Sequence, residues 1–305
     1  MNPEAAPLLP PRVLVVGDVM TDIICLPEGP IERGSDRRAS IRLRPGGSGA
    51  NQASWLAALG LAVRFAARVG VEDAERLTAD FAASGVVASL AADPELPTGT
   101  LVTLVAPDGE RSFLTDRGAN ARLSAADLPE SLLDGCAMLV ISGYALFEAG
   151  PRGAVGALMA RARDRRIPVA VDPASVGFLR ELGVATFLDA TRGATTLFAN
   201  EAEALVLAGS GGLAEALPTL AATYGRVVVK RGPAGALIAS HGVIETERLA
   251  PEVTAIDTTG AGDAFAAAFI ASELSGMDQA AALERAVAAG TEAVTRIGGR
   301  PPAKQ

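Results

Sequence analysis

Short apolar runs recur along the chain and are separated by polar or glycine-containing breaks, as around Ala137–Ile141. Between several of these runs lie longer segments whose apolar spacing is typical of a helix. Strands are predicted at Arg12–Asp18, Leu61–Arg68, Met138–Ser142, Pro168–Asp172, Thr195–Ala199 and Arg226–Arg231. Helices are predicted at Gln52–Leu59, Asp73–Ala83, Arg152–Asp164, Glu201–Leu207, Leu213–Tyr224 and Gln279–Arg296. This alternation predicts an α/β fold with a mostly parallel sheet that is covered by helices on both faces.

Two further regions predict a second, smaller sheet. Residues 31–44 contain five arginines and are expected to form strands with a polar outer face. Thr98–Ala106 and Arg111–Thr115 form a clearer pair of strands, because the Pro107-Asp108-Gly109-Glu110 segment between them has the composition of a hairpin turn. Most of the arginines are expected to be solvated.

Length and composition exclude several classes of protein. A chain of 305 residues is long enough for a substantial core, as one large domain or two ordinary ones. No apolar stretch approaches the roughly 20 residues of a membrane helix, so no membrane partner is expected. Met1–Pro10 has neither a basic cluster nor an apolar core, so we expect no secretory signal. Cys25 and Cys136 lie far apart without metal-ligand spacing, which indicates free thiols in a cytoplasmic protein.

Charge and histidine content narrow the chemistry. The net charge of −8 and the lack of a basic run with aromatic residues argue against nucleic acid as a partner. His241 is the only histidine and lies in a Ser-His-Gly turn, so a Ser-His-Asp or Cys-His mechanism is not expected. An acidic protein still binds ATP where backbone amides and Mg²⁺ supply the local positive charge.

The nonamer Asp257–Phe265 carries the strongest candidate chemistry. Its Gly260-Ala261-Gly262 turn runs directly into an alanine-rich helix, so several N–H groups lack helical acceptors and suit an anion such as a phosphoryl group. Asp263 lies in the first helical turn. It is either a helix cap, which is the commoner role for such a residue, or a base that takes a proton from a hydroxyl.

Two other groups of polar residues suit hydroxyl-bearing ligands. Asp18 and Asp22 follow the first strand, where they either cap a turn or accept hydrogen bonds from sugar hydroxyls. The glycines of Gly46-Gly47-Ser48-Gly49 permit a close and flexible approach of the backbone to a substrate. Asn51 offers both a donor and an acceptor to a hydroxyl.

Two strand ends carry candidate nucleotide and metal groups. Asn200 and Glu203 either form a capping box at a helix start or place a carboxylate near Mg²⁺ that is held through water. Lys230, Gly232 and Gly235 follow a strand, where the glycines also suit an ordinary hairpin turn.

The nonamer resembles the second signature of the ribokinase (PfkB) family, and Gly46–Ala53 resembles the first. The two motifs occur in the family order, 211 residues apart, and the resemblance extends from the first strand to about Gly299. It implies a single domain over residues 1–305, with a ribokinase-like three-layer αβα sandwich and a lid formed by about 24–45 and 97–119. The Arg117-Gly118-Ala119-Asn120 segment closes the lid, and its Gly-Ala-Asn resembles the same place in ribokinases.

The resemblance also implies an ATP-dependent kinase that phosphorylates a hydroxyl of a sugar or sugar derivative. Asp263 is then the base, and Gly260, Ala261 and Gly262 form the anion hole. Substrate contacts are expected from Asp22, Asp18, Gly47, Ser48, Gly49 and Asn51, and ATP contacts from Asn200, Lys230, Gly232, Gly235 and Gly262. Glu203 is expected to hold Mg²⁺ through water, and Asp257 and Thr259 match ligands of a monovalent cation such as K⁺. No catalytic role is expected for Lys230, because the family commonly has an uncharged residue there.

Two departures from the ribokinase pattern bear on the substrate and the cation. Met20 replaces an asparagine that accompanies the substrate aspartate, and Pro302 replaces a serine ligand of the cation. The sequence contains neither a Walker P-loop nor a Rossmann fingerprint after the first strand. A nucleoside kinase and a catalytically silent sugar-binding protein remain alternatives on the same fold. An exposed face of the lid is expected to permit a homodimer.

Overall fold

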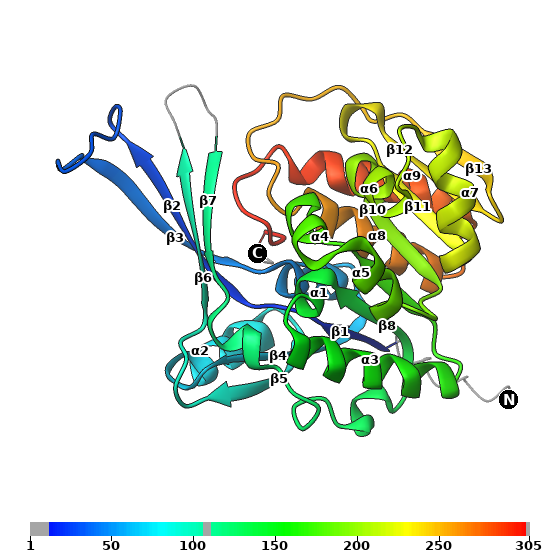
Figure 1. Cartoon of the computed structure of the whole chain (residues 1–305), viewed down its shortest axis with the longest axis horizontal. Helices are drawn as coiled ribbons and strands as arrows, with labels where there is room; N and C mark the ends of the chain where they lie inside the picture. Colours follow the sequence, from blue (N-terminus) through cyan, green and yellow to red (C-terminus); the bar gives the residue numbers. More distant parts are fainter. Residues whose placement is uncertain (1–11, 106–110, 303–305) are drawn as a thin grey trace, which may run out of the picture.

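The computed structural model describes residues 12–105 and 111–302, which form one large sheet with helices on both faces and a small separate sheet (Figure 1). In these ranges the large sheet has the strand order β13-β12-β11-β10-β9-β8-β1-β4-β5. Its strands are β1 Arg12–Val16, β4 Ala62–Gly70, β5 Val86–Asp93, β8 Cys136–Ser142, β9 Val169–Asp172, β10 Thr196–Asn200, β11 Arg226–Lys230, β12 Ala236–Ser240 and β13 Val243–Arg248. Neighbouring strands from β5 to β11 pair in parallel, whereas β12 and β13 add an antiparallel edge.

Two buried clusters fill the spaces above and below the large sheet. The helices are α1 Ser48–Ala58, α2 Val71–Ala83, α3 Ala149–Asp164, α4 Val176–Leu182, α5 Val184–Ala190, α6 Glu201–Ala208, α7 Leu213–Tyr224, α8 Ala261–Leu274 and α9 Gln279–Ala293. Val13 and Val15 of β1 belong to the cluster that includes residues of α1, α2, α8 and α9. Leu14 and Val16 belong to the cluster that includes residues of α3, α6 and α7. A strand buried on both faces is therefore apolar at consecutive positions, as the sequence predicted.

The small sheet, which we call the lid, has the strand order β3-β2-β6-β7. Its strands are β2 Met20–Pro27, β3 Ala39–Gly46, β6 Gly99–Val105 and β7 Arg111–Asp116. The lid thus begins at Met20, earlier than the predicted 24. The prediction of strands through residues 31–44 was partly wrong, because residues 31–38 form turns and irregular chain before β3. The predicted hairpin turn at 107–110 lies outside the described residues.

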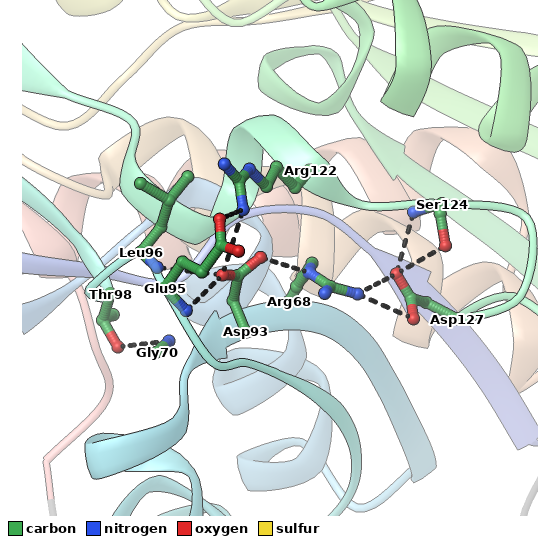
Figure 2. A network of polar contacts seen from close by, with 9 residues as sticks. All are labelled: Arg68, Gly70, Asp93, Glu95, Leu96, Thr98, Arg122, Ser124 and Asp127. Carbon is green, nitrogen blue, oxygen red and sulfur yellow. Dashed lines mark hydrogen bonds and ion pairs between the residues drawn. The ribbon is translucent and has the colours of Figure 1, made fainter.

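An ion-pair network lies at the base of the lid, where β5 leads into β6 and β7 leads back into the body (Figure 2). Arg68 at the end of β4 donates from Nε to Asp93 Oδ2 at 2.9 Å and from Nη1 to Asp127 Oδ2 at 2.9 Å. Arg122, after β7, pairs with Glu95 Oε2 at 2.7 Å. Glu95 N–H donates to Asp93 Oδ1 at 3.0 Å, and this bond and its neighbours fix the turn before β6. The network therefore joins the segment that leads into β6 and the segment that follows β7 to strand β4 of the large sheet.

In the described ranges no single helix is long and apolar enough to cross a membrane, although α6 and α7, bent by 72°, would together meet the same length and composition test.

Candidate active site

A cleft of about 1050 Å³ lies between the lid, the carboxyl ends of the central strands and the amino end of α8. The sequence-predicted residues that line it are Asp18, Asp22, Gly47, Ser48, Asn51, Asn200, Glu203, Lys230, Gly232, Gly235, Thr259, Gly260, Ala261, Gly262 and Asp263. Gly49 and Asp257 do not line it. The parallel strands explain this grouping, because their carboxyl ends meet at one edge of the sheet, where ligands bind in open α/β folds.

Asp263 joins the two motifs that the sequence places far apart. Its Oδ1 accepts hydrogen bonds from Ser48 Oγ at 2.7 Å and Gln52 Nε2 at 3.2 Å, and its Oδ2 accepts one from Asn51 Nδ2 at 3.0 Å. These three donors lie in the first turns of α1, which packs against α8. The amide nitrogen of Asn51 thus holds Asp263, while its Oδ1 is buried and has no hydrogen-bond partner among the described residues, so the predicted contact of Asn51 with a substrate hydroxyl stays a prediction.

The environment of Asp263 suits a base at neutral pH. Asp263 is buried, with only 8% of its surface exposed. Burial, and then the negative charge of Asp172, raise the pKa of Asp263 to about 7, although hydrogen bonds from Ser48 and Asn51 and the charge of Lys230 act in the opposite direction. A carboxylate with this pKa accepts a proton near pH 7 more effectively than an ordinary aspartate. In the described chain, the Asp263 carboxylate accepts hydrogen bonds from side chains of α1 and from no backbone N–H of α8, so the helix-capping alternative is not supported.

The amino end of α8 presents free N–H groups to the cleft. Gly260 precedes the helix with φ of 74°, a left-handed conformation that favours glycine. In the described chain, the N–H groups of Gly262 and Asp263 donate no hydrogen bond, whereas Ala261 N–H donates to Thr258 O at a long 3.4 Å. The first turn of a helix leaves such donors for an anion. We therefore expect Gly262 and Asp263 to contribute the better donors, and Ala261 a weaker one.

The segment Gly298–Arg300 closes the back of this turn. A Cβ on Gly260 would lie 2.4 Å from the Cα of Gly299, so the two backbones touch. Trp55 Nε1 of α1 donates to Gly299 O at 2.9 Å. The contact between these segments fixes the position of residues 260–263, which we call the anion-binding turn because of the role predicted for it.

Asp22 lies on lid strand β2 and not in the turn after β1, where the sequence placed it. Among the described residues its Oδ1 is buried without a hydrogen-bond partner, which is unusual for a carboxylate oxygen unless a ligand supplies the donor. Burial and the neighbouring charge of Asp18 raise the pKa of Asp22 to about 6, against the opposing charge of Arg300. The substrate contact predicted for Asp22 stays a prediction, with an oxygen free to accept a hydrogen bond.

Asp18 and the first-motif glycines mainly hold the backbone together. Asp18 Oδ1 accepts from Gly49 N–H at 3.1 Å and from Ser142 Oγ at 3.3 Å. A Cβ on Gly49 would lie 2.6 Å from the Cα of Gly17, so Gly49 permits close packing of α1 against the end of β1. The prediction of Gly49 as a flexible substrate contact was wrong, because it lies inside helix α1 and packs against the protein's own backbone.

Asn200 and Glu203 form a capping box at the start of α6. Asn200 Oδ1 accepts from Glu203 N–H, and Glu203 Oε2 accepts from Asn200 N–H, both at 2.8 Å. Burial, and then the charge of Asp172, raise the pKa of Glu203 to about 7, although Lys230 and the Asn200 N–H lower it. The described residues contain no group of three or more His, Cys, Asp or Glu side chains that could hold a metal ion, but Mg²⁺ retains much of its water and needs only one or two carboxylates, such as Glu203. Capping and metal binding are therefore compatible at Glu203.

The loop after β11 is a hairpin that also borders the cleft. Gly232 and Gly235 flank a short 3₁₀ turn, and Arg231 N–H donates to Gly235 O at 2.8 Å. Lys230 Nζ donates to Asp172 Oδ2 at 2.7 Å. Asp172 was predicted only as the end of a strand. Its position at the carboxyl end of β9 was the signal that could have identified it as a site residue.

Asp257 and Thr259 lie together behind the anion-binding turn. Asp257 Oδ1 accepts from Thr259 Oγ1 at 2.7 Å and from Thr259 N–H at 3.0 Å. Asp257 Oδ2 accepts from Gly298 N–H at 3.0 Å. The structure thus brings together the residues predicted to border a monovalent cation.

The lid end of the cleft contains aromatic and cationic groups that sequence reasoning missed. Phe113, Tyr144 and Phe178 line it, with the rings of Tyr144 and Phe178 in edge contact at 5.4 Å. The Arg117 guanidinium lies 5.4 Å from the centre of the Tyr144 ring and donates to Tyr144 O at 2.7 Å. The arginine was predicted only as the end of the lid segment, because no local pattern indicated its neighbours.

The fold and cleft define a class of α/β proteins with a large, mostly parallel sheet, a separate lid sheet and a cleft between them. Residues 10–305 match the pfkB family of carbohydrate kinases, and the chain belongs to that family. An ATP-dependent ribose-1-phosphate kinase of Halopiger xanaduensis is 31% identical over an alignment of 303 positions, gaps included, that covers 95% of this chain and 94% of that protein. The bifunctional protein HldE of Koribacter versatilis is 30% identical over an alignment of 315 positions, gaps included, that covers 95% of this chain, but the chain spans only 60% of that protein.

A solved structure supports the same assignment. A putative ribokinase II from E. coli, in complex with ATP and Mg²⁺, superposes with a TM-score of 0.84 at 26% identity, covering 95% of this chain and 94% of that one. The predicted ribokinase-like fold, with its large, mostly parallel sheet and its lid, is confirmed.

Proposed function

We propose that this protein transfers the γ-phosphoryl group of ATP to a hydroxyl of a sugar or sugar derivative. The observation that carries the proposal is Asp263, a buried carboxylate whose pKa is raised to about 7 at the amino end of α8. It faces the cleft that Asp22 borders from the lid side. A base, free helix N–H groups and an unsatisfied hydroxyl acceptor in one cleft suit this transfer.

The proposed reaction uses these groups in one displacement. Asp22 accepts a hydrogen bond from a hydroxyl of the substrate and orients it, and Asp263 accepts the proton of the attacking hydroxyl. The acceptor oxygen forms a bond to the γ-phosphorus while the bond from that phosphorus to the bridging oxygen of ADP breaks. The N–H groups at the start of α8 donate to the phosphoryl oxygens, where preorganised donors stabilise the developing charge.

Metal ions complete the proposed site. Mg²⁺ bound to the phosphates would neutralise part of their charge, and Glu203 would hold it through water beside Asn200. Asp257 and Thr259 would border a monovalent cation next to Gly298. The cytoplasm, which is rich in ATP and keeps thiols reduced, is the proposed compartment.

A nucleoside is the second candidate acceptor. Phe113 projects from the lid on the same face as Asp22 and is 58% exposed, and Tyr144 and Phe178 lie across the same end of the cleft. Aromatic side chains at a binding site suit a planar base. Turnover of sugars compared with turnover of nucleosides therefore distinguishes the two candidate acceptors.

We expect ADP release to depend on the acceptor. With ATP alone the protein should hydrolyse little nucleotide, because the base faces a substrate hydroxyl and the lid must close over it. A coupled ADP assay with sugars, ribose 1-phosphate, sugar acids and nucleosides tests this, with and without K⁺. Vigorous hydrolysis that no acceptor alters would contradict the proposal, and nucleotide binding without any turnover would favour a silent binding protein.

Chelation of Mg²⁺ should abolish turnover, and Glu203→Gln should raise the Mg²⁺ concentration required.

We also propose that two copies pair through the outer face of the lid. The strand register places Ile23, Ile41, Leu43, Val102 and Leu114 on the face opposite Asp22. Ile41, Leu43 and Leu114 are each more than 60% exposed. A sheet with one uncovered apolar face needs a covering layer, and the same face of a second copy supplies one.

Sedimentation velocity should therefore show a dimer that Leu43→Lys dissociates into monomers. Val243→Lys is the matched control, because Val243 is similarly exposed, at 64%, but lies on β13 far from the lid in sequence and outside its sheet. A wild-type monomer at tens of micromolar would rule out the pairing.

A further inference from the structure

Lys230 brings an ammonium group to the start of α8. It is the last residue of β11, and its side chain is 16% exposed. A Cβ on Gly262 would lie 3.1 Å from Lys230 Nζ, so the ammonium is beside the helix turn that presents its N–H groups to the cleft. The charge of Lys230 also lowers the pKa of Asp263. The ammonium is therefore close to both the anion-binding turn and the base.

Asp172 fixes the position of this ammonium. Its Oδ2 accepts from Lys230 Nζ at 2.7 Å, and its Oδ1 accepts from Ala174 N–H at 3.0 Å. Ala174 has φ of 80°, a left-handed conformation that is strained for a residue other than glycine. Strained backbone of this kind occurs at functional sites, where the surroundings hold it in place. The carboxylate is thus held by its own chain and in turn holds the lysine.

Lys230 retains donors for a ligand. An ammonium group has three N–H donors and no acceptor. In the described part of the chain, Asp172 is the one acceptor within hydrogen-bond distance of Nζ. Burial lowers the pKa of Lys230, but Asp172 and Glu203 outweigh that effect and raise it above its ordinary value, so the group stays charged. A charged group with free donors beside an anion site is suited to a phosphoryl oxygen.

We propose that Lys230 donates a hydrogen bond to the phosphoryl group in transfer and that Asp172 is the residue that positions it. This inference rests on the proposed kinase function, replaces the expectation that Lys230 has no catalytic role, and adds a cationic contact to the backbone donors of α8. Lys230 keeps its proton throughout: the proton of the acceptor hydroxyl goes to Asp263, and the electron pair of the broken bond goes to ADP. As charge shifts onto the phosphoryl oxygens, a fixed cation stabilises it without reorganisation.

The competing explanation is that the pair only joins β9 to β11. Removing one partner of a buried pair lowers stability whether or not it touches a ligand. Arg226 offers a matched control at the opposite end of β11: its Nη2 donates to Glu273 Oε2 at 2.9 Å, and its side chain is 17% exposed. Arg226→Met removes a comparable ion pair from the same strand, away from the cleft.

Two measurements test the proposal on the full-length protein. Calorimetry with Mg²⁺ gives the affinities for ATP and ADP, and steady-state kinetics gives kcat and KM. Lys230→Met should weaken ATP binding about 10-fold and leave ADP binding within about 2-fold, because only ATP carries the contacted group. It should lower kcat by about 10²–10³-fold, the usual effect of losing one preorganised donor. Lys230→Arg should recover part of the ATP preference.

The other variants separate positioning from structure. Asp172→Asn should lower kcat about 10-fold or more, because a loosely held ammonium is misplaced, and should retain part of the ATP preference. Arg226→Met should lower the urea midpoint while kcat and the ratio of ATP to ADP affinity stay at the wild-type values.

A folded Lys230→Met protein with wild-type kcat and an unchanged ATP/ADP affinity ratio would overturn the inference while the kinase function stood. If Lys230→Met does not fold, Lys230→Gln, which keeps a hydrogen bond to Asp172, is read by the same criteria. If no acceptor is turned over, the kinase function fails, and the ATP/ADP affinity ratio still decides whether Lys230 contacts the γ-phosphoryl group.

Discussion

Asp263→Asn should lower kcat by about 10²–10⁴-fold and leave the KM of the acceptor nearly unchanged, because a positioned base acts mainly in the transition state. The asparagine retains an oxygen for Ser48 Oγ but has no basic lone pair for the hydroxyl proton. Its amide nitrogen would face the Asn51 amide, which now donates to Asp263 Oδ2. If the amide of Asn51 or of the new asparagine rotates by half a turn, an N–H donor again faces an oxygen acceptor. Steady-state kinetics with the acceptor found by the ADP assay provides the test.

The pH dependence of the wild-type enzyme should show the same group. Because the pKa of Asp263 is raised to about 7, the carboxylate is protonated below that pH and cannot accept the hydroxyl proton. The value of kcat/KM should therefore rise with pH and level off above about 7. A profile that is flat between pH 5 and 8 would exclude Asp263 as the base.

Stability should respond to the same carboxyl with the opposite sign. The folded state binds the Asp263 proton more tightly than the unfolded state, so this group's contribution to the free energy of unfolding is fully present below about pH 4. It is lost as pH rises to about 7. At pH 8, Asp263→Asn should therefore be no less stable than wild type. Urea unfolding at pH 4.5 and pH 8 measures this effect, and intact circular dichroism confirms the fold of the variant.

Asp22→Asn is the contrasting variant. It should raise the acceptor KM and leave ATP binding nearly intact, because Asp22 lies on the lid and its unsatisfied Oδ1 is placed for a substrate hydroxyl. Some loss of kcat is also expected, since a poorly held hydroxyl is badly oriented. A variant pair with the same kinetic defect would mean that the two carboxylates do not have separate roles. A folded Asp263→Asn protein with wild-type kcat would remove the assignment of the base.

Gly260→Ala should destabilise the protein by about 2–5 kcal/mol and lower kcat at least 10-fold. Part of the loss, about 1–2 kcal/mol, is the cost of φ near 74° for a residue with a Cβ. The rest, about 1–3 kcal/mol, arises because the new Cβ would lie 2.4 Å from the Cα of Gly299 and must displace that segment. Displacement of the turn would move the N–H donors away from the phosphoryl group. Even a small shift of such donors lowers kcat substantially.

Gly276→Ala isolates the two contributions. Gly276 also has positive φ, 83°, but nothing lies within 4 Å of a Cβ built there. It should lose only the conformational part, about 1–2 kcal/mol, with kcat unchanged. Urea unfolding and kcat on both variants give the comparison. Equal losses of stability, with full activity in Gly260→Ala, would show that the contact with Gly299 does not fix the catalytic turn.

Local periodicity accounts for most of the architecture that was predicted. The valine-rich run of β1 and the capping box of Asn200 and Glu203 are properties of neighbouring residues, and both are confirmed. The edge strands β5 and β13 and the short helices α4 and α5 were not predicted, because such elements carry weak patterns, and the short internal strand β12 was missed as well. The edge strands gain their structure from pairing with a neighbour, which the sequence alone does not reveal.

The sequence by itself determined the family motifs, the α/β class and the identity of the candidate base, because each rests on residues that are close together in the chain. Only the tertiary structure decided what surrounds that base. Asn51 and Asp263 are 212 positions apart, and Lys230 and Asp172 are 58 apart, so no local pattern could pair them. Parallel strands bring their carboxyl ends to one edge whatever the spacing in sequence, and that geometry places the lysine, the carboxylates and the helix turn around one cleft.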